Sequence, residues 1–475
     1  MKRIAIIGGG VSGLAAAFAL EERRREGAHI EYTIYEASAR LGGVLRTERV
    51  DGCLIEAGPD SFISEKPWAA ELCRQLGLGD QLIGSNDAAR KTYILVKGRL
   101  VPIPDGLMFM VPTKITPAVL SPLFSFRSKV RMAREWFHSP KRSDADETVA
   151  SLVERHYGRE VVERLADPML AGVYGGDASE LSVRAVLPRF AEMEAQHGSL
   201  GRAMIAARKK MGPAGNRAKP SLFTSLKDGM QQLTDTLLTR LPPQAIRNSV
   251  PVQAIQREHD DWLVSAGYKS DVFDAVIVAT PAKAAAALLQ IVTPALAAEL
   301  GSVRYSSSVT VALGYGPEVR ATLPAGFGFL VPRGEGIRML ASTFVHNKFP
   351  HRAPDDRALI RCFFGGSRDE AILDISDSEV LGIAQQELGK ILGITAEPLF
   401  TRVYKWPGSM AQYAVGHLEK LERIERLRRE LPGLALAGNA YRGIGVPDCV
   451  RSGKEAAVRS LQYLGIAQPE AAVAM

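Results

Sequence analysis

Short continuous apolar runs, separated by glycine-rich and helical segments, set the pattern of this chain. Residues 4–7 form the first run, and residues 274–281 contain another that Pro281 stops, while residues 30–35 are predicted as a second strand. Runs of this length are typical of strands buried on both faces of a sheet. An alanine-rich helical stretch reaching about Leu20 separates the first run from residues 30–35, so the start of the chain predicts a βαβ unit.

A glycine motif lies between the first strand and this helix. Its residues are Gly8, Gly9, Gly10, Val11, Ser12 and Gly13. The spacing fits G-x-G-x-x-G, in which the glycines allow a tight turn, close approach of a pyrophosphate and packing of the helix on the strand. Glu36 ends the second strand, where a carboxylate can bind ribose hydroxyls. The segment predicts a dinucleotide site, and an ordinary glycine-rich turn is the alternative.

The rest of the pattern predicts a discontinuous organisation. Residues 1–85, 221–285 and 431–475 carry nucleotide-fold elements: a hairpin at residues 248–266, and a strand at residues 434–437 followed by a helix. Residues 86–105 and 286–430 mix strands with helices. Residues 106–220 carry helical patterns, among them residues 161–171, and end in a linker at residues 211–220. We predict an α/β fold with a discontinuous Rossmann-like cofactor domain, a mixed α/β substrate domain and a helical insertion.

Composition narrows the classes of partner. The chain has 475 residues and a net charge of +7, which favours an anionic partner or surface. Nucleic acid is disfavoured because no basic run alternates with aromatic residues. The four cysteines are far apart and the eight histidines form no metal motif, so no metal is predicted. No apolar stretch reaches the about 18 residues that a membrane-spanning helix needs.

A second segment indicates which dinucleotide binds. Ala37 follows Glu36, Arg40 can pair with phosphate, and Gly42-Gly43 lets the backbone close over the cofactor. With Gly58-Pro59-Asp60-Ser61, the pattern resembles the FAD-binding start of the amine-oxidase and protoporphyrinogen-oxidase group.

Four further segments make the resemblance more specific. Residues 168–184, 326–332, 363–368 and 406–418 resemble the protoporphyrinogen and coproporphyrinogen oxidase family of haem biosynthesis. The resemblance extends from residue 2 to about residue 464. It implies one non-covalently bound FAD per chain, with Val252 and Trp406 among its contacts.

The C-terminal segment carries the second cofactor signal. Gly438, Asn439, Gly445 and Val446 belong to a glycine-containing turn that allows close approach to a flat cofactor. The helix that follows begins near residues 447–448, so its positive end is expected to face the isoalloxazine and to favour reduced, anionic flavin. A plain strand–turn–helix crossover is the alternative.

The resemblance also implies substrate residues. Phe363, Leu330 and Thr343 occupy positions that clamp a tetrapyrrole in the family, which usually has an aliphatic residue at the position of Thr343. The remaining candidates are Gly172, Phe327, Gly328, Arg90 and Lys91. Apolar walls with basic groups at the rim suit a macrocycle with propionate arms. Each lone Arg or Lys has a solvated surface charge as its alternative.

The implied reaction is the six-electron, FAD-dependent oxidation of a porphyrinogen to a porphyrin, with dioxygen as acceptor. Such chemistry needs positioning more than acid–base groups, and we assign no catalytic side chain. Coproporphyrinogen III and protoporphyrinogen IX both stay open as substrates. The alternatives are an amine oxidase, a carotenoid-type desaturase and a non-enzymatic prenyl-protein carrier. A cytoplasmic location and product hand-off to a ferrochelatase are further expectations.

One surface segment suggests a membrane contact. Apolar residues 107–111 and 120–126 precede a basic stripe, Arg127, Lys129, Arg131 and Arg134. An apolar patch beside cations suits peripheral contact with anionic lipid on the inner face of the membrane. The alternative is a helix that packs on its own domain with a solvated basic face.

Overall fold

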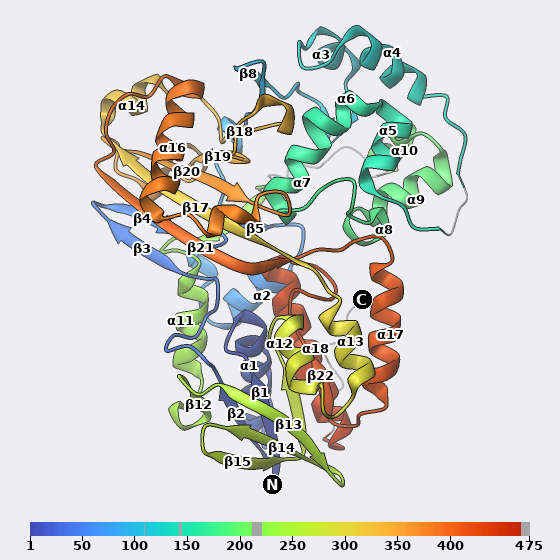
Figure 1. Ribbon diagram of the computed structural model, residues 1–475, viewed down its shortest axis with the longest axis vertical. Helices are drawn as coiled ribbons and strands as arrows, with labels where there is room; N and C mark the ends of the chain where they lie inside the picture. Colours follow the sequence, from blue (N-terminus) through green and yellow to red (C-terminus); the bar gives the residue numbers. More distant parts are fainter. Residues whose placement is uncertain (109, 142–144, 211–220, 467–475) are drawn as a thin grey trace.

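The computed structural model describes residues 1–108, 110–141, 145–210 and 221–466. The predicted linker at residues 211–220 and Phe109 of the predicted apolar segment lie outside this part. In Figure 1 a parallel sheet with its helices lies at the bottom, a seven-stranded sheet at the upper left and a group of helices at the upper right. The predicted α/β fold class is confirmed.

The parallel sheet has five strands in the order β12-β2-β1-β16-β22. They are β1 (Lys2–Ile7), β2 (Ile30–Tyr35), β12 (Ile246–Arg247), β16 (Ala275–Val278) and β22 (Leu434–Leu436). Ile4 and Ile6 of β1 pack in one core with α1 (Val11–Arg25) and α18 (Val446–Tyr463). Ala5 and Ile7 pack in a second core on the opposite face. Burial on both faces explains why the central strands β1 and β16 contain continuous apolar runs.

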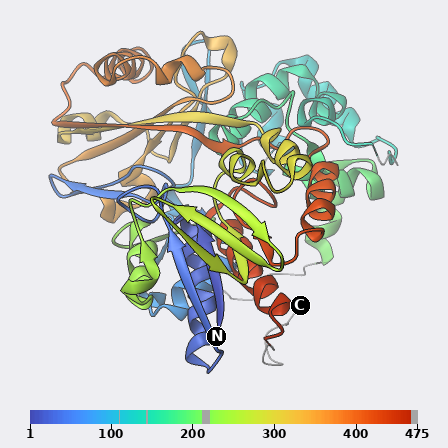
Figure 2. The same cartoon turned by 60° about the horizontal axis from the view of Figure 1, so that its bottom comes forward.

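The second core is covered by a small antiparallel sheet and three helices. The sheet is β13 (Val252–Glu258), β14 (Asp261–Ala266) and β15 (Lys269–Phe273), and it comes forward in Figure 2. The helices are α12 (Ala282–Leu289), α13 (Pro294–Gly301) and α17 (His417–Arg429). Trp262, which is fully buried, fills the space between the two sheets. The sequence predicted the β13–β14 hairpin, and the structure adds β15.

The seven-stranded sheet has the order β21-β17-β20-β19-β18-β7-β8. Its strands are β7 (Thr92–Val96), β8 (Arg99–Pro102), β17 (Tyr305–Tyr315), β18 (Gly328–Leu330), β19 (Ala341–Phe344), β20 (Ala358–Gly365) and β21 (Phe400–Ala411). The helix α16 (Asp377–Leu392) covers one face through a continuous core. We keep the predicted domain limits as a proposal, which this strand pairing supports.

The third part consists of helices from residues 115–210. They are α3 (Ile115–Leu120), α4 (Phe126–Glu135), α5 (Val149–Tyr157), α6 (Arg159–Val161), α7 (Asp167–Tyr174), α8 (Val183–Val186), α9 (Pro188–His197) and α10 (Leu200–Lys210). The sequence predicted one helix over residues 161–171. The structure instead has a π-helical turn at Val162–Ala166 between α6 and α7. Pro168 gives the reason, since it lacks an N–H and its ring excludes a regular helix one turn earlier.

Smaller elements join these parts. They are β3 (Thr47–Val50), β4 (Cys53–Glu56), β5 (Phe62–Ile63), α2 (Trp68–Gln75), β6 (Leu82–Gly84), β9 (Leu107–Met108), β10 (Val111–Pro112), β11 (Phe223–Leu226), α11 (Gln231–Arg240), α14 (Pro317–Thr322) and α15 (Val345–Lys348). Within the described ranges, no helix is both long and apolar enough to cross a bilayer.

Candidate functional site

The turn between β1 and α1 combines crowded glycines with an open one. Gly8 has a φ of +108°, which side chains rarely adopt, and a Cβ on Gly13 would lie 1.9 Å from the carbonyl oxygen of Gly8. A Cβ on Gly10 would meet nothing within 4 Å. Gly10 precedes Val11 and Ser12 at the start of α1, where no side chain caps the free N–H groups. These residues therefore leave the kind of space that a pyrophosphate fits.

Glu36 holds this turn from the end of β2. Its carboxylate oxygen Oε2 accepts a hydrogen bond from the backbone N–H of Gly9 at 2.7 Å. The backbone carbonyl of Glu36 accepts from the N–H of Val250 at 2.9 Å, which brings Val252 at the start of β13 close to it. Ala37, the next residue, is exposed. Contact of this group with ribose stays a prediction.

Arg40 has a contact that the sequence did not predict. Its guanidinium donates to three carbonyl oxygens of the loop at residues 41–45, among them that of Leu41 at 2.9 Å. The same loop lies over the glycine turn, because the N–H of Gly42 donates to the carbonyl of Gly9 at 2.8 Å. Arg40 thus shapes the loop that contains Gly42 and Gly43, and its contact with phosphate stays a prediction.

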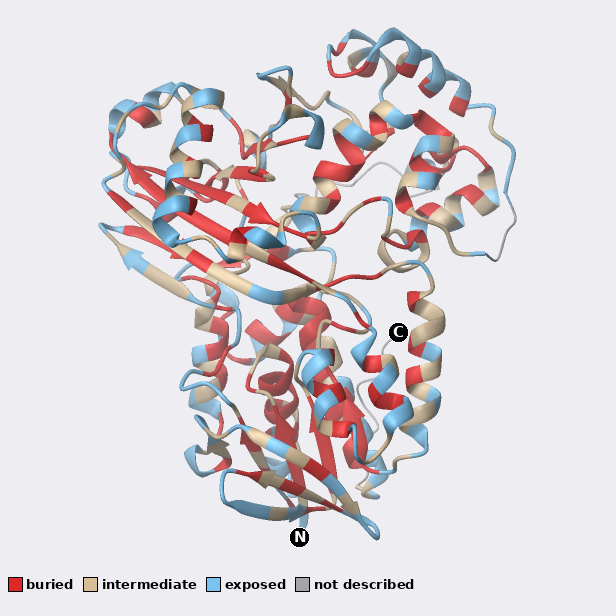
Figure 3. Cartoon of the chain, viewed as in Figure 1, coloured by how far each residue is buried: buried red, intermediate tan, exposed pale blue. Residues whose placement is uncertain are grey.

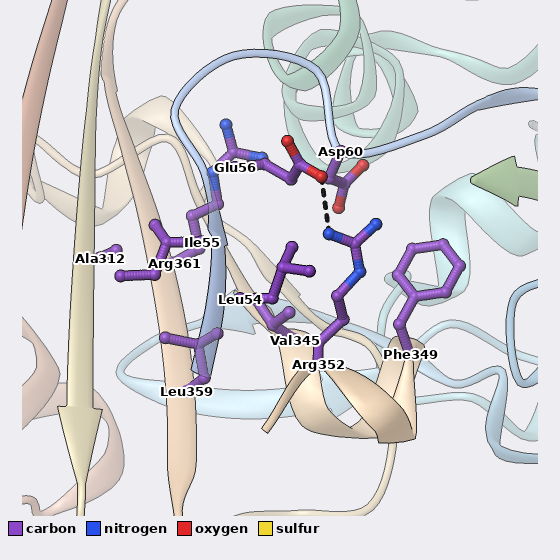
Figure 4. A pocket seen from close by; sticks show the side chains of 10 residues that line it. All are labelled: Leu54, Ile55, Glu56, Asp60, Ala312, Val345, Phe349, Arg352, Leu359 and Arg361. Atoms are coloured by element: carbon purple, nitrogen blue, oxygen red, sulfur yellow. Dashed lines mark hydrogen bonds and ion pairs between the residues drawn. The ribbon is translucent and has the colours of Figure 1, made fainter. Parts of the chain in front are cut away.

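Two ion pairs fix the loop after β4, and Figure 4 shows the one between Glu56 and Arg352 from close by. Arg352 is 1% exposed and donates through Nη1 to Glu56 Oε1 at 2.6 Å. Lys348 donates to both carboxylate oxygens of Asp60 at 3.0 and 2.9 Å. Burial opposes the charge of Asp60, but Lys348 and Arg361 outweigh it and hold the pKa of this carboxyl well below its usual range. The loop is therefore anchored to α15 and to the residues that follow it.

The other residues of this loop are also constrained. A Cβ on Gly58 would lie 2.0 Å from the carbonyl oxygen of Val44, so only glycine fits there. Ser61 donates through its hydroxyl to Asp60 at 2.7 Å, and Pro59 is partly buried. These contacts together constrain the backbone conformation of the loop.

Tyr413 fixes the C-terminal glycine segment. Its hydroxyl donates to the carbonyl oxygen of Asn439 at 2.7 Å and accepts from the N–H of Gly443 at 2.9 Å. Burial raises the pKa of Tyr413 well above 10, so the hydroxyl keeps its proton. Its ring stacks on His417 at 4.0 Å between centroids. The sequence predicted the segment but not the tyrosine that holds it.

The first turn of α18 carries a buried carboxylate, whereas only the positive end of the helix was expected here from the sequence. Gly438 has a φ of +133°, and Gly445 immediately precedes Val446, the first residue of α18. Asp448 lies in the first turn, is 3% exposed and accepts from Lys66 Nζ at 2.7 Å. The Asp448 carboxylate offsets part of the positive helix end, and Lys66 adds a positive charge beside it.

The register of the seven-stranded sheet brings three predicted substrate residues together. Phe363 pairs with Ala341, Ala341 pairs with Leu330, and Thr343 pairs with Gly328. Paired residues and alternate residues share a face, so Phe363, Leu330 and Thr343 lie on one face of the sheet. The opposite face carries the core under α16, which includes Phe329, Phe344, Cys362 and Phe364.

Arg361 and Trp406 join this face of the sheet to the loop after β4 through hydrogen bonds. Arg361 donates through Nη2 to the carbonyl oxygens of Ala57, at 3.3 Å, and Gly58. Its guanidinium carbon lies 4.8 Å from the ring centroid of Phe363. Trp406 donates through Nε1 to the same Ala57 oxygen at 2.9 Å. The predicted substrate wall and the predicted cofactor loop are therefore in direct contact.

The remaining substrate candidates lie around this face. Gly172 is in α7, and a Cβ there would lie 3.6 Å from Leu330 Cδ2. Phe327 is buried and donates its N–H to the carbonyl of Lys91 at 2.7 Å. Arg90 and Lys91 are exposed just before β7. Their contact with a propionate stays a prediction.

Sequence reasoning missed the basic residues Lys348, Arg352 and Arg361. Arg361 and Ala57 are 304 residues apart in sequence, and Lys348 and Asp60 are 288 apart, so no local motif joins them. One signal was available for Arg361. It stands in an otherwise apolar strand, and a buried charge there needs a buried partner.

Comparison with known proteins supports this organisation. A family model described as flavin-containing amine oxidoreductase matches residues 11–461. A coproporphyrinogen III oxidase of Bacillus subtilis (strain 168) is 36% identical over 473 residues and covers 98% of each chain. One of Staphylococcus aureus is 30% identical and covers 96% of this chain and 98% of its own. A crystal structure from Exiguobacterium sp. 255-15, provisionally assigned as a protoporphyrinogen oxidase, superposes with a TM-score of 0.87 at 31% identity and covers 98% and 99% of the two chains.

Proposed function

Because the chain belongs to the flavin-containing amine oxidoreductase family, we propose that it oxidises a porphyrinogen to a porphyrin in haem biosynthesis. The full-length relatives at 36% and 30% identity are named for coproporphyrinogen III, and this favours coproporphyrinogen III as substrate over protoporphyrinogen IX. One observation carries the proposal. The face with Phe363, Leu330 and Thr343 lies against the loop at Ala57 and Gly58.

The cofactor is a flavin, and we propose non-covalent FAD. The open space at Gly10 and the loop at residues 41–45 suit the pyrophosphate of a dinucleotide flavin. The cysteine of the C-terminal segment, Cys449, is buried, and burial raises the pKa of its thiol to about 12. A thiol held in its neutral form is a poor nucleophile, which favours non-covalent binding.

When bound, a flavin supplies the hydride acceptor for each two-electron step. The role of the protein in the reaction is to hold the macrocycle in a fixed position beside the flavin and to exclude water. Phe363 and Leu330 provide the apolar wall, and Arg361 keeps Phe363 in place beside the loop after β4. We assign no side chain as general base. We propose dioxygen as the terminal acceptor and a ferrochelatase as the enzyme that receives the product.

Anaerobic flavin reduction tests the function. Purified protein is mixed with coproporphyrinogen III, protoporphyrinogen IX or a primary amine, and bleaching of the flavin absorbance is followed. We expect both porphyrinogens to bleach it, coproporphyrinogen III with the higher second-order rate constant, and the amine to leave it oxidised. Reduction by the amine alone would support an amine oxidase instead, and a colourless protein that binds no FAD would support the carrier alternative.

We also propose peripheral contact between the helical part and anionic lipid. Leu120, Phe126 and Phe137 are 77%, 80% and 81% exposed, while α4 buries Met132 instead. In Figure 3 the outer faces of α3 and α4 are coloured as exposed. Arg127, Arg131 and Arg134 are exposed and Lys129 is half-buried on the same helix. Exposed apolar side chains beside cations suit the interface of an anionic membrane.

A further inference from the structure

One guanidinium joins the end of the seven-stranded sheet to both ends of α7. Arg368 follows β20 and donates through Nη1 and Nη2 to the two carboxylate oxygens of Asp167 at 2.7 and 2.9 Å. It also donates through Nε to Asp177 at 2.5 Å. Asp167 is the first residue of α7, and Asp177 lies three residues beyond its last residue, Tyr174.

The chain after α7 turns back to make this possible. Gly175 adopts a left-handed conformation with a φ of +57°. The N–H of Ala178 then donates to Asp167 Oδ1 at 3.2 Å, so the two aspartates face one guanidinium. Asp167 is 7% exposed, and burial raises the pKa of its carboxyl although Arg368 opposes this. The pair is bidentate, and the Asp167 carboxylate is buried although the Arg368 side chain stays 29% exposed.

A second contact joins the same two segments. The N–H of Ser367 donates to the carbonyl oxygen of Gly175 at 2.7 Å. Close approach is possible because Gly366 precedes Ser367, and a Cβ on Gly366 would lie 2.9 Å from that oxygen. The backbone at the end of β20 therefore rests directly on the C-terminal end of α7.

The position of α7 matters because of Gly172. This glycine faces Leu330 of the substrate wall, and a Cβ on it would be 3.6 Å from Leu330 Cδ2. Leu330 shares its sheet face with Phe363, five residues before Arg368 in the chain. The same stretch of chain thus contains one proposed wall residue, Phe363, and the arginine that pairs with the two aspartates flanking Gly172.

We propose that Arg368 is a positioning residue that fixes α7, and with it Gly172, against Leu330 of the proposed substrate wall. The inference rests on the proposed porphyrinogen oxidation, in which the placement of Gly172 and Leu330 would determine how well the macrocycle fits. Without this guanidinium, the carboxylates of Asp167 and Asp177 lose their shared cation and repel each other. The turn after α7 then moves away from Asp167, and the wall at Gly172 moves with it.

The test compares two arginines with the same type of bond. Arg338 also donates through Nε and Nη2 to one carboxylate, Asp369, at 2.9 and 2.8 Å, but it does not reach α7. We expect Arg368→Gln to raise KM for coproporphyrinogen III by about one to two orders of magnitude, because misplacement by about 1 Å has effects of this size. FAD content, the visible flavin spectrum and the limiting rate of flavin reduction should change much less. Arg338→Gln should leave KM within twofold.

Two further readouts keep the test decisive. Amide hydrogen exchange over residues 167–178 should become faster in Arg368→Gln and stay unchanged in Arg338→Gln, with or without substrate. Adding Asp177→Asn to Arg368→Gln should lower KM again, because it removes the repulsion. Should Arg368→Gln fail to fold, Arg368→Lys keeps the charge but loses the bidentate geometry, and it should show an intermediate KM.

Unchanged KM and unchanged exchange in the Arg368 variants would overturn the inference while the wild-type protein still oxidises porphyrinogen. Equal effects in Arg338→Gln would overturn it too, since they would mean a general loss of stability. A wild-type flavin that no porphyrinogen reduces would instead overturn the proposed function, and the exchange measurement would still decide whether Arg368 fixes α7.

Discussion

The carboxylate of Glu36 accepts a hydrogen bond of 2.7 Å from the backbone N–H of Gly9, so the acidic residue at the end of β2 is bonded to the glycine turn itself. The bond couples the two elements that the sequence assigns to ribose and to pyrophosphate. The same carboxylate also accepts from the N–H and the hydroxyl of Ser38 at 2.8 and 2.7 Å, which leaves about one of its roughly four acceptor positions for a ribose hydroxyl. Glu36 thus shapes the turn whether or not a nucleotide is bound.

Glu36→Ala should weaken FAD binding about 10- to 100-fold, because a hydrogen bond to a charged group contributes about 1.5–3 kcal/mol. The dissociation constant is measured from the recovery of free FAD fluorescence on dilution. Glu31→Gln is the matched control, since Glu31 is an exposed carboxylate of the same strand. An unchanged dissociation constant in Glu36→Ala would mean that the Glu36–Gly9 hydrogen bond stabilises the fold but does not contribute to FAD binding.

Gly10→Glu should give a folded but colourless protein, because its side chain enters open space and would place a negative charge where the pyrophosphate is proposed to bind. Gly13→Ala should instead lower the melting temperature, since its Cβ would lie 1.9 Å from the Gly8 carbonyl oxygen. Flavin absorbance per protein and the thermal midpoint of the apoprotein separate the two effects. A yellow Gly10→Glu protein would move the cofactor away from this turn.

Phe363→Ala should raise KM for a porphyrinogen by about 5- to 150-fold, from the loss of about 1–3 kcal/mol of aromatic contact, and leave FAD content intact. Phe364→Ala is the control on the opposite face of β20. Phe364 is fully buried, so that variant should lose about 3–5 kcal/mol of unfolding free energy. Steady-state kinetics and urea unfolding are measured on both, and the reverse pattern would contradict the assigned face.

Reversing the charges of Arg127, Lys129 and Arg131 to Glu should abolish co-sedimentation with anionic liposomes at low salt. Reversing Lys227, Lys269 and Lys283, which are exposed elsewhere, should change binding little because they lie outside the helical part. Binding by the wild type should fall as salt rises. Equal binding to neutral and anionic liposomes would leave only the apolar side chains as the basis of any contact.

The stability of the protein should depend on His346 in mild acid. Burial lowers the pKa of His346 from 6.5 to about 4, while its Nδ1 accepts the N–H of Leu359 at 3.2 Å. Between pH 6.5 and 4 the unfolded chain binds a proton that the folded chain does not, so the free energy of unfolding falls as the pH falls through this window, by up to about 3 kcal/mol.

His346→Asn keeps an acceptor for Leu359 and has no proton to bind, so its unfolding free energy should fall less between pH 6.5 and 4. The control is His29→Asn, a change at an exposed histidine, and its unfolding free energy should depend on pH as that of the wild type does. Urea unfolding across this pH range measures the difference. Parallel curves for His346→Asn and wild type would assign the acid sensitivity to other groups, such as carboxylates or His417, whose pKa burial also lowers.

The local sequence pattern was enough to predict the βαβ unit at the start of the chain. The apolar run Ile4–Ile7 and the spacing of Gly8, Gly10 and Gly13 are both visible within a short stretch of sequence. The pattern predicted a helix over residues 161–171, which is helical throughout, but missed the π-helical turn at Val162–Ala166 within it. It also failed for Arg361 and Arg368, whose partners lie 304 and 201 residues away. Long-range ion pairs leave no period in a sequence, so residues that hold the site together are the hardest to predict.

The order of the parallel sheet has a consequence for how the chain folds as it is made. β1 and β2 are translated first, but the second partner of β1 is β16, which follows β2 by about 240 residues. At about 5–20 residues per second, β1 waits for β16 for roughly 12–48 s. Its apolar residues and one strand edge are open during that time, and open edges invite wrong pairing. The open edge of β1 is therefore covered only once β16 has emerged, and a product that ends before β22 lacks the last strand of this sheet.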